Sequence, residues 1–168
     1  MNSNLLIREA TSADIAAIRQ IAHATWPVAY GNLLSAEQLS YMLGMMYSEP
    51  SLQQQFTKGD HFYLAVQNEV PVGFASVSNE HNGRFKLNKL YVLPTTQKTG
   101  AGRALLDEVT TYARQHNGTE LYLQVKRDNP AKTFYEKIGF EVTDEVDLDI
   151  GNGYFMNDYL MTLRLINN

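Results

Sequence analysis

Residues 97–102 have the types and the spacing of a site that could bind an anion. This polar stretch with two glycines follows a short apolar strand at residues 90–92 and precedes an amphipathic helix. Glycines ahead of a helix let the backbone approach a ligand closely, and the first N–H groups of the helix have no intrahelical partner. The helix dipole also favours negative charge at this end. We therefore predict a phosphate-binding loop.

The composition of this loop limits which phosphate-containing ligands it could bind. A nucleoside-triphosphatase loop needs a Gly-Lys-Ser/Thr ending, and no such residues follow these glycines. A dinucleotide fingerprint needs a third small residue for close helix packing, but Leu105 stands there. Both alternatives are therefore disfavoured.

A second motif, at residues 129–140, makes the pattern specific. It begins with Asn129 and Pro130, contains Tyr135, and ends with Gly139 and Phe140. Together with Gln-x-x-Gly-x-Gly after a strand, this motif resembles the GNAT superfamily of acyl-CoA-dependent N-acetyltransferases, with an N-terminal half similar to the bacterial spermidine/spermine acetyltransferase branch. The resemblance covers nearly the whole chain and implies acetyl-CoA as co-substrate. The residues that it implies for the cofactor are Leu90, Val92, Gln97, Lys98, Thr99, Gly100, Ala101, Gly102, Arg103, Ala104, Asn129, Lys132, Tyr135 and Lys137.

The chemistry of amine acetylation assigns further roles. A primary alkylammonium is almost wholly protonated at neutral pH, so the enzyme must remove a proton, directly or through water, before nitrogen can attack the thioester. The departing thiolate then needs a proton, and Tyr135 resembles the family's tyrosine for that role. The alternative is that Tyr135 is only a core residue. For Lys98 and Arg103 the alternative is that both are solvated side chains.

The general base is not evident from the sequence. Several family members carry a glutamate on the fourth strand, but residues 86–89 here contain no carboxylate. A water-relayed base is therefore expected, with Tyr30, Glu37 and His81 as candidates and with Trp26 in the acceptor wall. The alternative for residues 26–31 is an aromatic loop packed only by its own side chains. The four histidines show no metal-ligand spacing, so we invoke no metal.

The apolar pattern predicts the elements that position these residues. Apolar residues alternate up to Leu87 and then slip by one before Leu90, which predicts a β-bulge near Asn88 and Lys89. In the family such a splay separates the fourth and fifth strands, and the acyl arm lies in the gap. A helix from Thr11 is expected to stop at Pro27. The fold class is a single α/β domain over residues 1–168, with a mixed, mostly antiparallel sheet flanked by helices.

Length and composition exclude several classes of protein. The chain has 168 residues, 44% of them hydrophobic and 19% charged, which is typical of one globular domain. Its net charge of −4, without a continuous basic run, disfavours a nucleic-acid partner. It has no cysteine, which excludes disulfides and a thiolate nucleophile. Without a long apolar segment or a leader we expect no membrane partner and a cytoplasmic protein.

The acceptor itself is only weakly indicated. Five carboxylates on one predicted strand could attract a polyamine, or they could protect an edge strand from pairing with another chain; they are Glu141, Asp144, Glu145, Asp147 and Asp149. Residues 151–159 could cover the site or meet a second subunit, since homodimers are common in the family. We expect a small-molecule primary amine that attacks in a ternary complex. The alternatives are a protein or peptide N-acetyltransferase and a non-catalytic acyl-CoA-binding module.

Overall fold

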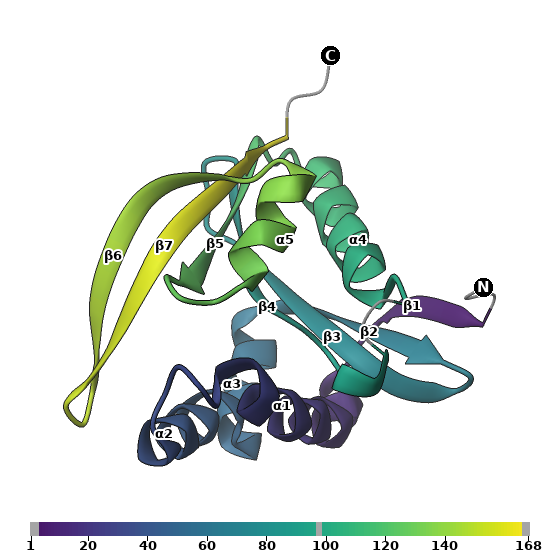
Figure 1. Cartoon of the computed structure of the whole chain (residues 1–168). Helices are drawn as coiled ribbons and strands as arrows, with labels where there is room; N and C mark the ends of the chain where they lie inside the picture. Colours follow the sequence, from purple (N-terminus) through teal and green to yellow (C-terminus); the bar gives the residue numbers. More distant parts are fainter. Residues whose placement is uncertain (1–3, 97–98, 166–168) are drawn as a thin grey trace.

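Seven strands form one twisted sheet that separates two layers of helices in the computed structural model, which describes residues 4–96 and 99–165 (Figure 1). The strands run in the order β1-β2-β3-β4-β5-β7-β6. The strands are β1 Leu5–Glu9, β2 His61–Gln67, β3 Val70–Asn79, β4 Arg84–Val92, β5 Glu120–Lys126, β6 Glu141–Gly151 and β7 Tyr154–Arg164. The helices are η1 Ser12–Asp14, α1 Ile15–Tyr30, α2 Ala36–Tyr47, α3 Glu49–Lys58, η2 Pro94–Thr96, α4 Ala101–Gln115 and α5 Ala131–Ile138.

Neighbouring strands are antiparallel except β4 and β5, which are parallel. The connection between this parallel pair is α4, as expected for a crossover that must return to the same edge of the sheet. The predicted fold class, a mixed and mostly antiparallel sheet flanked by helices, is therefore confirmed.

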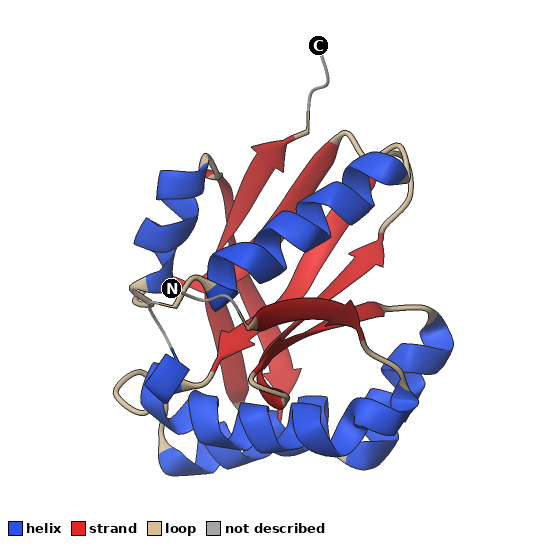
Figure 2. Ribbon diagram, turned by 90° about the vertical axis from the view of Figure 1, so that its right-hand side faces the viewer, coloured by secondary structure: helices blue, strands red, loops and turns tan. Residues whose placement is uncertain are grey.

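The two faces of the sheet bury separate apolar clusters. Helices α1, α2 and α3 cover one face, with Trp26 and Tyr47 in their core, whereas α4 and α5 cover the other, with Leu105 and Tyr135 in theirs (Figure 2). On β4, Leu87 belongs to the cluster under α4 and α5, whereas Tyr91 packs against the other cluster. Among the described residues, no helix combines the length and the apolar character needed to cross a lipid bilayer.

The expectation that the first helix stops at Pro27 is wrong. Helix α1 continues to Tyr30 with Pro27 inside it. A proline in a helix removes one N–H donor and leaves the carbonyl four residues earlier without that partner. Here that carbonyl belongs to His23, and both His23 and Pro27 are exposed, so water can satisfy the group. Burial of Trp26 on the opposite side of the helix stabilises the extra turn.

The last two strands form a long curved hairpin whose tip lies near α2 (Figure 1). The Tyr41 hydroxyl donates a 2.8 Å hydrogen bond to the Ile150 carbonyl, and the Gln38 amide donates one of 3.3 Å to the Phe155 carbonyl. The Tyr41 ring also packs against the Tyr154 ring, with 5.4 Å between their centroids. The hairpin is thus held across the helical layer rather than left free in solvent.

Candidate active site

A cleft opens where β4 parts from β5. Val77 of β3 pairs with Leu87 of β4, and Ser76 pairs with Lys89, so Asn88 has no partner in the register. This is the predicted β-bulge, and it is confirmed. The pairing of β4 with β5 ends at Lys86, and beyond this point the two strands diverge.

A cavity of about 380 Å³, here called the splay cavity, fills this divergence. Its walls come from the second half of β4, from β5, from the start of α5 and from the end of α1. Its lining residues include Tyr30, Asn88, Leu90, Val92, Asn129 and Tyr135.

A groove of about 470 Å³, here called the loop groove, continues from the splay cavity to the start of α4. It shares Leu90, Val92 and Tyr135 with the splay cavity and adds Gly100, Gly102 and Arg103. Gly100 precedes α4 with φ 89°, a left-handed conformation that suits glycine. The first N–H groups of α4 lack intrahelical partners, so this end of the groove suits an anionic group.

Gly73 lets β3 and β4 approach closely beside this groove. A Cβ atom at Gly73 would lie 2.9 Å from the Tyr91 carbonyl oxygen and 3.1 Å from Val92 Cγ2. The absence of a side chain at Gly73 therefore permits the close approach of β4, the strand that lines both the cavity and the groove.

Tyr135 lies between the splay cavity and the loop groove. Its side chain is 8% exposed and belongs to the apolar face of α5. Burial raises the pKa of its hydroxyl above the usual range, and the nearby Tyr30 raises it further. Tyr135 is consequently protonated at neutral pH and can act as a proton donor toward a group in the splay cavity.

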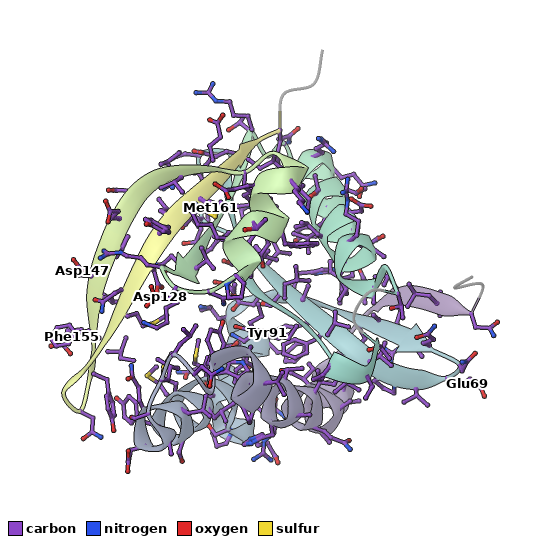
Figure 3. The ribbon with its side chains drawn as sticks, viewed as in Figure 1. Glu69, Tyr91, Asp128, Asp147, Phe155 and Met161 are labelled. Atoms are coloured by element: carbon purple, nitrogen blue, oxygen red, sulfur yellow. The ribbon has the colours of Figure 1, made fainter. Side chains whose placement is uncertain are left out.

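A second cavity, of about 280 Å³ and here called the hairpin cavity, lies on the other side of β4. It is enclosed by α1, α2, β4, β5 and the β6–β7 hairpin. Its apolar lining consists of Trp26, Leu34, Met42, Met45, Met46, Leu87, Leu148, Ile150, Phe155 and Met156. Figure 3 shows Phe155 on the hairpin and Tyr91 in the interior of the molecule, between the sheet and α1.

Tyr30 stands where the two cavities meet and lines both. Its hydroxyl shares a 2.9 Å hydrogen bond with the Tyr91 hydroxyl, and its ring packs 4.7 Å from the Trp26 ring, centroid to centroid. Burial raises the pKa of Tyr30, although the hydrogen bond to Tyr91 opposes the shift. The aromatic contacts hold Tyr30 at the boundary between the cavities.

Asp158 is a buried carboxylate in the wall of the hairpin cavity that sequence reasoning missed. It is 2% exposed, and its Oδ2 has no hydrogen-bond partner among the described residues. Burial raises its pKa, while the positive charges of Lys126, Arg127 and Lys86 oppose that shift. A signal was present: Asp158 is in phase with Met156 and Leu160 on one face of β7, where a lone carboxylate is unusual.

Lys89 also lines both cavities and is 7% exposed. Its Nζ lies 5.2 Å from the centroid of the Tyr47 ring. Burial lowers the pKa of Lys89 to about 8, against the attraction of Asp60. A buried lysine therefore lies on β4, within the stretch where several family members carry a glutamate.

The structure brings together only part of the predicted site. Thr99, Ala101 and Ala104 shape the glycine loop and the first turn of α4 without lining a cavity, and Gln97 and Lys98 lie outside the described residues. Lys132 lies near the ring of Tyr159 and forms an ion pair with Glu136, and Lys137 is exposed; neither lines these cavities.

Of the residues predicted to contact the acceptor or to serve as its base, only some line a cavity. Trp26 and Tyr30 line the hairpin cavity, but as the end of α1 rather than as the loop expected for residues 26–31. Glu37 and His81 are exposed and line neither cavity, because Glu37 is in the first turn of α2 and His81 is in the β3–β4 turn, before β4 begins. The five carboxylates of β6 are exposed on an edge strand and do not line the hairpin cavity.

Comparisons with known proteins agree with this geometry. The sequence profile of a family described as "Acetyltransferase (GNAT) domain" matches residues 33–155. An aminoglycoside N(6')-acetyltransferase type 1 of Stenotrophomonas maltophilia is 32% identical over 149 residues, covering 83% of this chain and 88% of that protein. The peptidyl-lysine N-acetyltransferase YjaB of Escherichia coli is 34% identical over 107 residues, covering 61% and 65%. The crystal structure of the PaiA N-acetyltransferase of Thermoplasma acidophilum, in complex with coenzyme A, has a TM-score of 0.81 at 23% identity and covers 95% of this chain and 98% of that one.

Proposed function

This chain belongs to the GNAT acetyltransferase family, and we propose that it transfers the acetyl group of acetyl-CoA to the primary amine of a small molecule by direct attack in a ternary complex. The observation that carries the proposal is the meeting of two cavities at the β4 bulge, with Tyr135 in one and Tyr30 between them. Each cavity has the size and the polarity for one of the two reactants.

The splay cavity and the loop groove suit the acetyl-CoA arm. The pyrophosphate would meet the first N–H groups of α4 beyond Gly100, where Arg103 adds positive charge. The peptide-like pantetheine would run along β4 past Leu90, in the gap left by β5. The same arm would place the thioester close to Tyr135.

The reaction follows from these positions. A neutral amine entering from the hairpin cavity would attack the thioester carbonyl, and a backbone N–H at the bulge near Asn88 would stabilise the oxyanion. When the carbon–sulfur bond breaks, Tyr135 would donate its proton to the thiolate. The chain has no cysteine, so transfer through a cysteine acyl-enzyme is excluded.

A small acceptor is favoured by the enclosure of the hairpin cavity. The β6–β7 hairpin covers it, and the hydrogen bond from Tyr41 to Ile150 holds that cover in place. A lysine or an N-terminus on a folded protein would have to enter past this hairpin. A protein or peptide acceptor is therefore the second candidate, and a non-catalytic acyl-CoA-binding module is the third.

The test replaces Tyr135 by phenylalanine and measures thiol release from acetyl-CoA with a panel of small amines and lysine peptides. Loss of a general acid lowers turnover by about 10² to 10⁴, while calorimetry should give an unchanged affinity for coenzyme A. Tyr112→Phe, near the C-terminal end of α4, is the control, because Tyr112 lines none of the three cavities.

Three other outcomes of this experiment would contradict the proposal. Full turnover by the Tyr135→Phe variant would remove Tyr135 from the mechanism. Release with peptides alone would favour the protein acetyltransferase, and binding of acetyl-CoA without release for any amine would favour the non-catalytic module.

A further inference from the structure

The hairpin cavity contains more positive than negative charge. Lys86 and Lys89 of β4 and Lys126 of β5 line it, whereas Asp158 is the carboxylate that the described residues contribute. A polyamine would place a second cation beside these lysines, which is unfavourable in a half-enclosed site. The lining therefore opposes a polycationic acceptor.

The carboxylate of Asp158 is available to bind a cationic group of a ligand. Its side chain is 2% exposed, the residue lines the cavity, and its Oδ2 has no hydrogen-bond partner among the described residues. Lys126 is its direct cross-strand partner, yet no ion pair of the described residues includes Asp158. An unsatisfied buried carboxylate is unfavourable unless a ligand completes it.

The lysines leave a place for an anion in the same cavity. Lys86 donates a 3.1 Å hydrogen bond to Gln124 Oε1, which fixes it at the cavity floor without neutralising its charge. Lys126 lies on the same face of the sheet, beside Asp158. Three neighbouring strands, β4, β5 and β7, thus present two ammonium groups and one carboxylate to the contents of the cavity.

We propose that the acceptor is an apolar primary amine that also carries a carboxylate, with its ammonium bound by Asp158 and its carboxylate by Lys126 and Lys86. This inference rests on the proposed acetyl transfer and names its acceptor class. The apolar body of such a molecule would contact Trp26 and Met42 in the remaining wall.

Asp158 then also serves as the proton acceptor. The ammonium gives one proton to the carboxylate, and the resulting amine attacks the carbonyl carbon while the carbon–sulfur bond breaks. Tyr135 protonates the departing thiolate and recovers a proton from the new amide nitrogen, so one proton in all passes to solvent through Asp158. The groups that act electrostatically on Asp158 are Lys126 of β5, Arg127 directly after that strand, Lys86 of β4 and Tyr30 of α1.

The experiment compares matched acceptors that differ only in the carboxylate. Thiol release from acetyl-CoA is measured with phenylalanine against 2-phenylethylamine, with methionine against 3-(methylthio)propylamine, and with spermidine. Hydrogen bonds to charged groups predict a preference for the carboxylated member of about ten- to a hundredfold in kcat/KM. Calorimetric titration of the coenzyme A complex with the same amines gives a second readout that needs no turnover.

Two variants separate recognition from folding. Lys126→Met should reduce the preference for the carboxylated acceptor toward one, and Asp158→Asn should lower kcat/KM for every amine and weaken its pH dependence. Asp158→Glu should restore part of the activity. Asp144→Asn, an exposed change in the same hairpin, and Arg114→Gln on α4 are the matched controls.

The outcomes are distinguishable. Thiol release confined to amines without a carboxylate, efficient use of spermidine, or a preference that survives Lys126→Met would overturn this inference but not the proposed acetyl transfer. Absence of release with every amine and peptide, together with calorimetric binding of acetyl-CoA, would overturn both.

Discussion

Lys89 gives a quantitative prediction, because its charge is buried in the wall between the two cavities. Burial lowers its pKa from 10.5 to about 8. Each unit corresponds to about 1.4 kcal/mol, so the protonated form of Lys89 destabilises the folded state by about 3 kcal/mol at neutral pH. The pKa of about 8 already includes the attraction of Asp60, but the cation–π contact with Tyr47 would be lost with the charge, which reduces the expected gain. Lys89→Met should therefore stabilise the protein at pH 7 by about 1 to 3 kcal/mol.

The sign of the pH dependence follows from proton binding. Between pH 8 and 10.5 the unfolded chain keeps the Lys89 proton that the folded chain has released, so the stability contributed by this site rises with pH. The groups that face Lys89 are Asp60, Lys58, Lys86 and Tyr47. The advantage of Lys89→Met should be constant below pH 7 and should shrink by roughly half or more by pH 9.5.

The assay is urea unfolding of parent and variant from pH 6.5 to 9.5. Comparing the two proteins at each pH cancels the contribution of buried tyrosines such as Tyr91, whose raised pKa acts above this range. Lys137→Met is the control, since Lys137 is exposed on α5 and should give a small, pH-independent change. A stability difference that is the same at both ends of the range, or a variant less stable than the parent at pH 7, would refute the reasoning.

Four further substitutions test the local geometry. Gly73→Ala places a Cβ 2.9 Å from the Tyr91 carbonyl oxygen, so it should lower the free energy of unfolding by about 1 to 3 kcal/mol and weaken coenzyme A binding. A Cβ at Gly44 would have nothing within 4 Å, so Gly44→Ala should instead stabilise α2. Urea unfolding measures the stability change of both variants. Tyr41→Phe removes the 2.8 Å hydrogen bond to Ile150 and should raise the acceptor KM and the hydrogen exchange of the hairpin tip, with coenzyme A affinity unchanged. Pro27→Ala restores a backbone N–H donor at an exposed position of α1 and should raise the thermal midpoint of unfolding. A lower midpoint would mean that Pro27 is needed for the end of α1.

The sequence predicts the fold well where local pattern and local structure agree. The slip in apolar phase between Leu87 and Leu90 located the bulge, because side chains on a strand alternate strictly and only an extra residue can change their face. The predicted helix end at Pro27 was wrong because a proline on the exposed face of a helix can be tolerated. The burial of Trp26 depends on contacts with Tyr47 and Tyr91, which are distant in sequence and so give no local signal.

The charges of the hairpin cavity could not be predicted because they depend on the register of three strands. Lys86 and Lys126 come from the parallel pair, and Asp158 comes from β7, which pairs with β5 although α5 and β6 lie between them in the sequence. The sequence shows only that residues 86–89 lack the carboxylate found there in several family members. In the folded sheet a buried carboxylate faces the same cavity from β7 while a lysine occupies β4. With the carboxylate on β7 instead of β4, the site keeps a group that could accept a proton from the amine. The lysines then lie where the carboxylate of an acceptor would bind. In the proposed mechanism, Asp158 would therefore serve as the base, and the lysines would select against polycations.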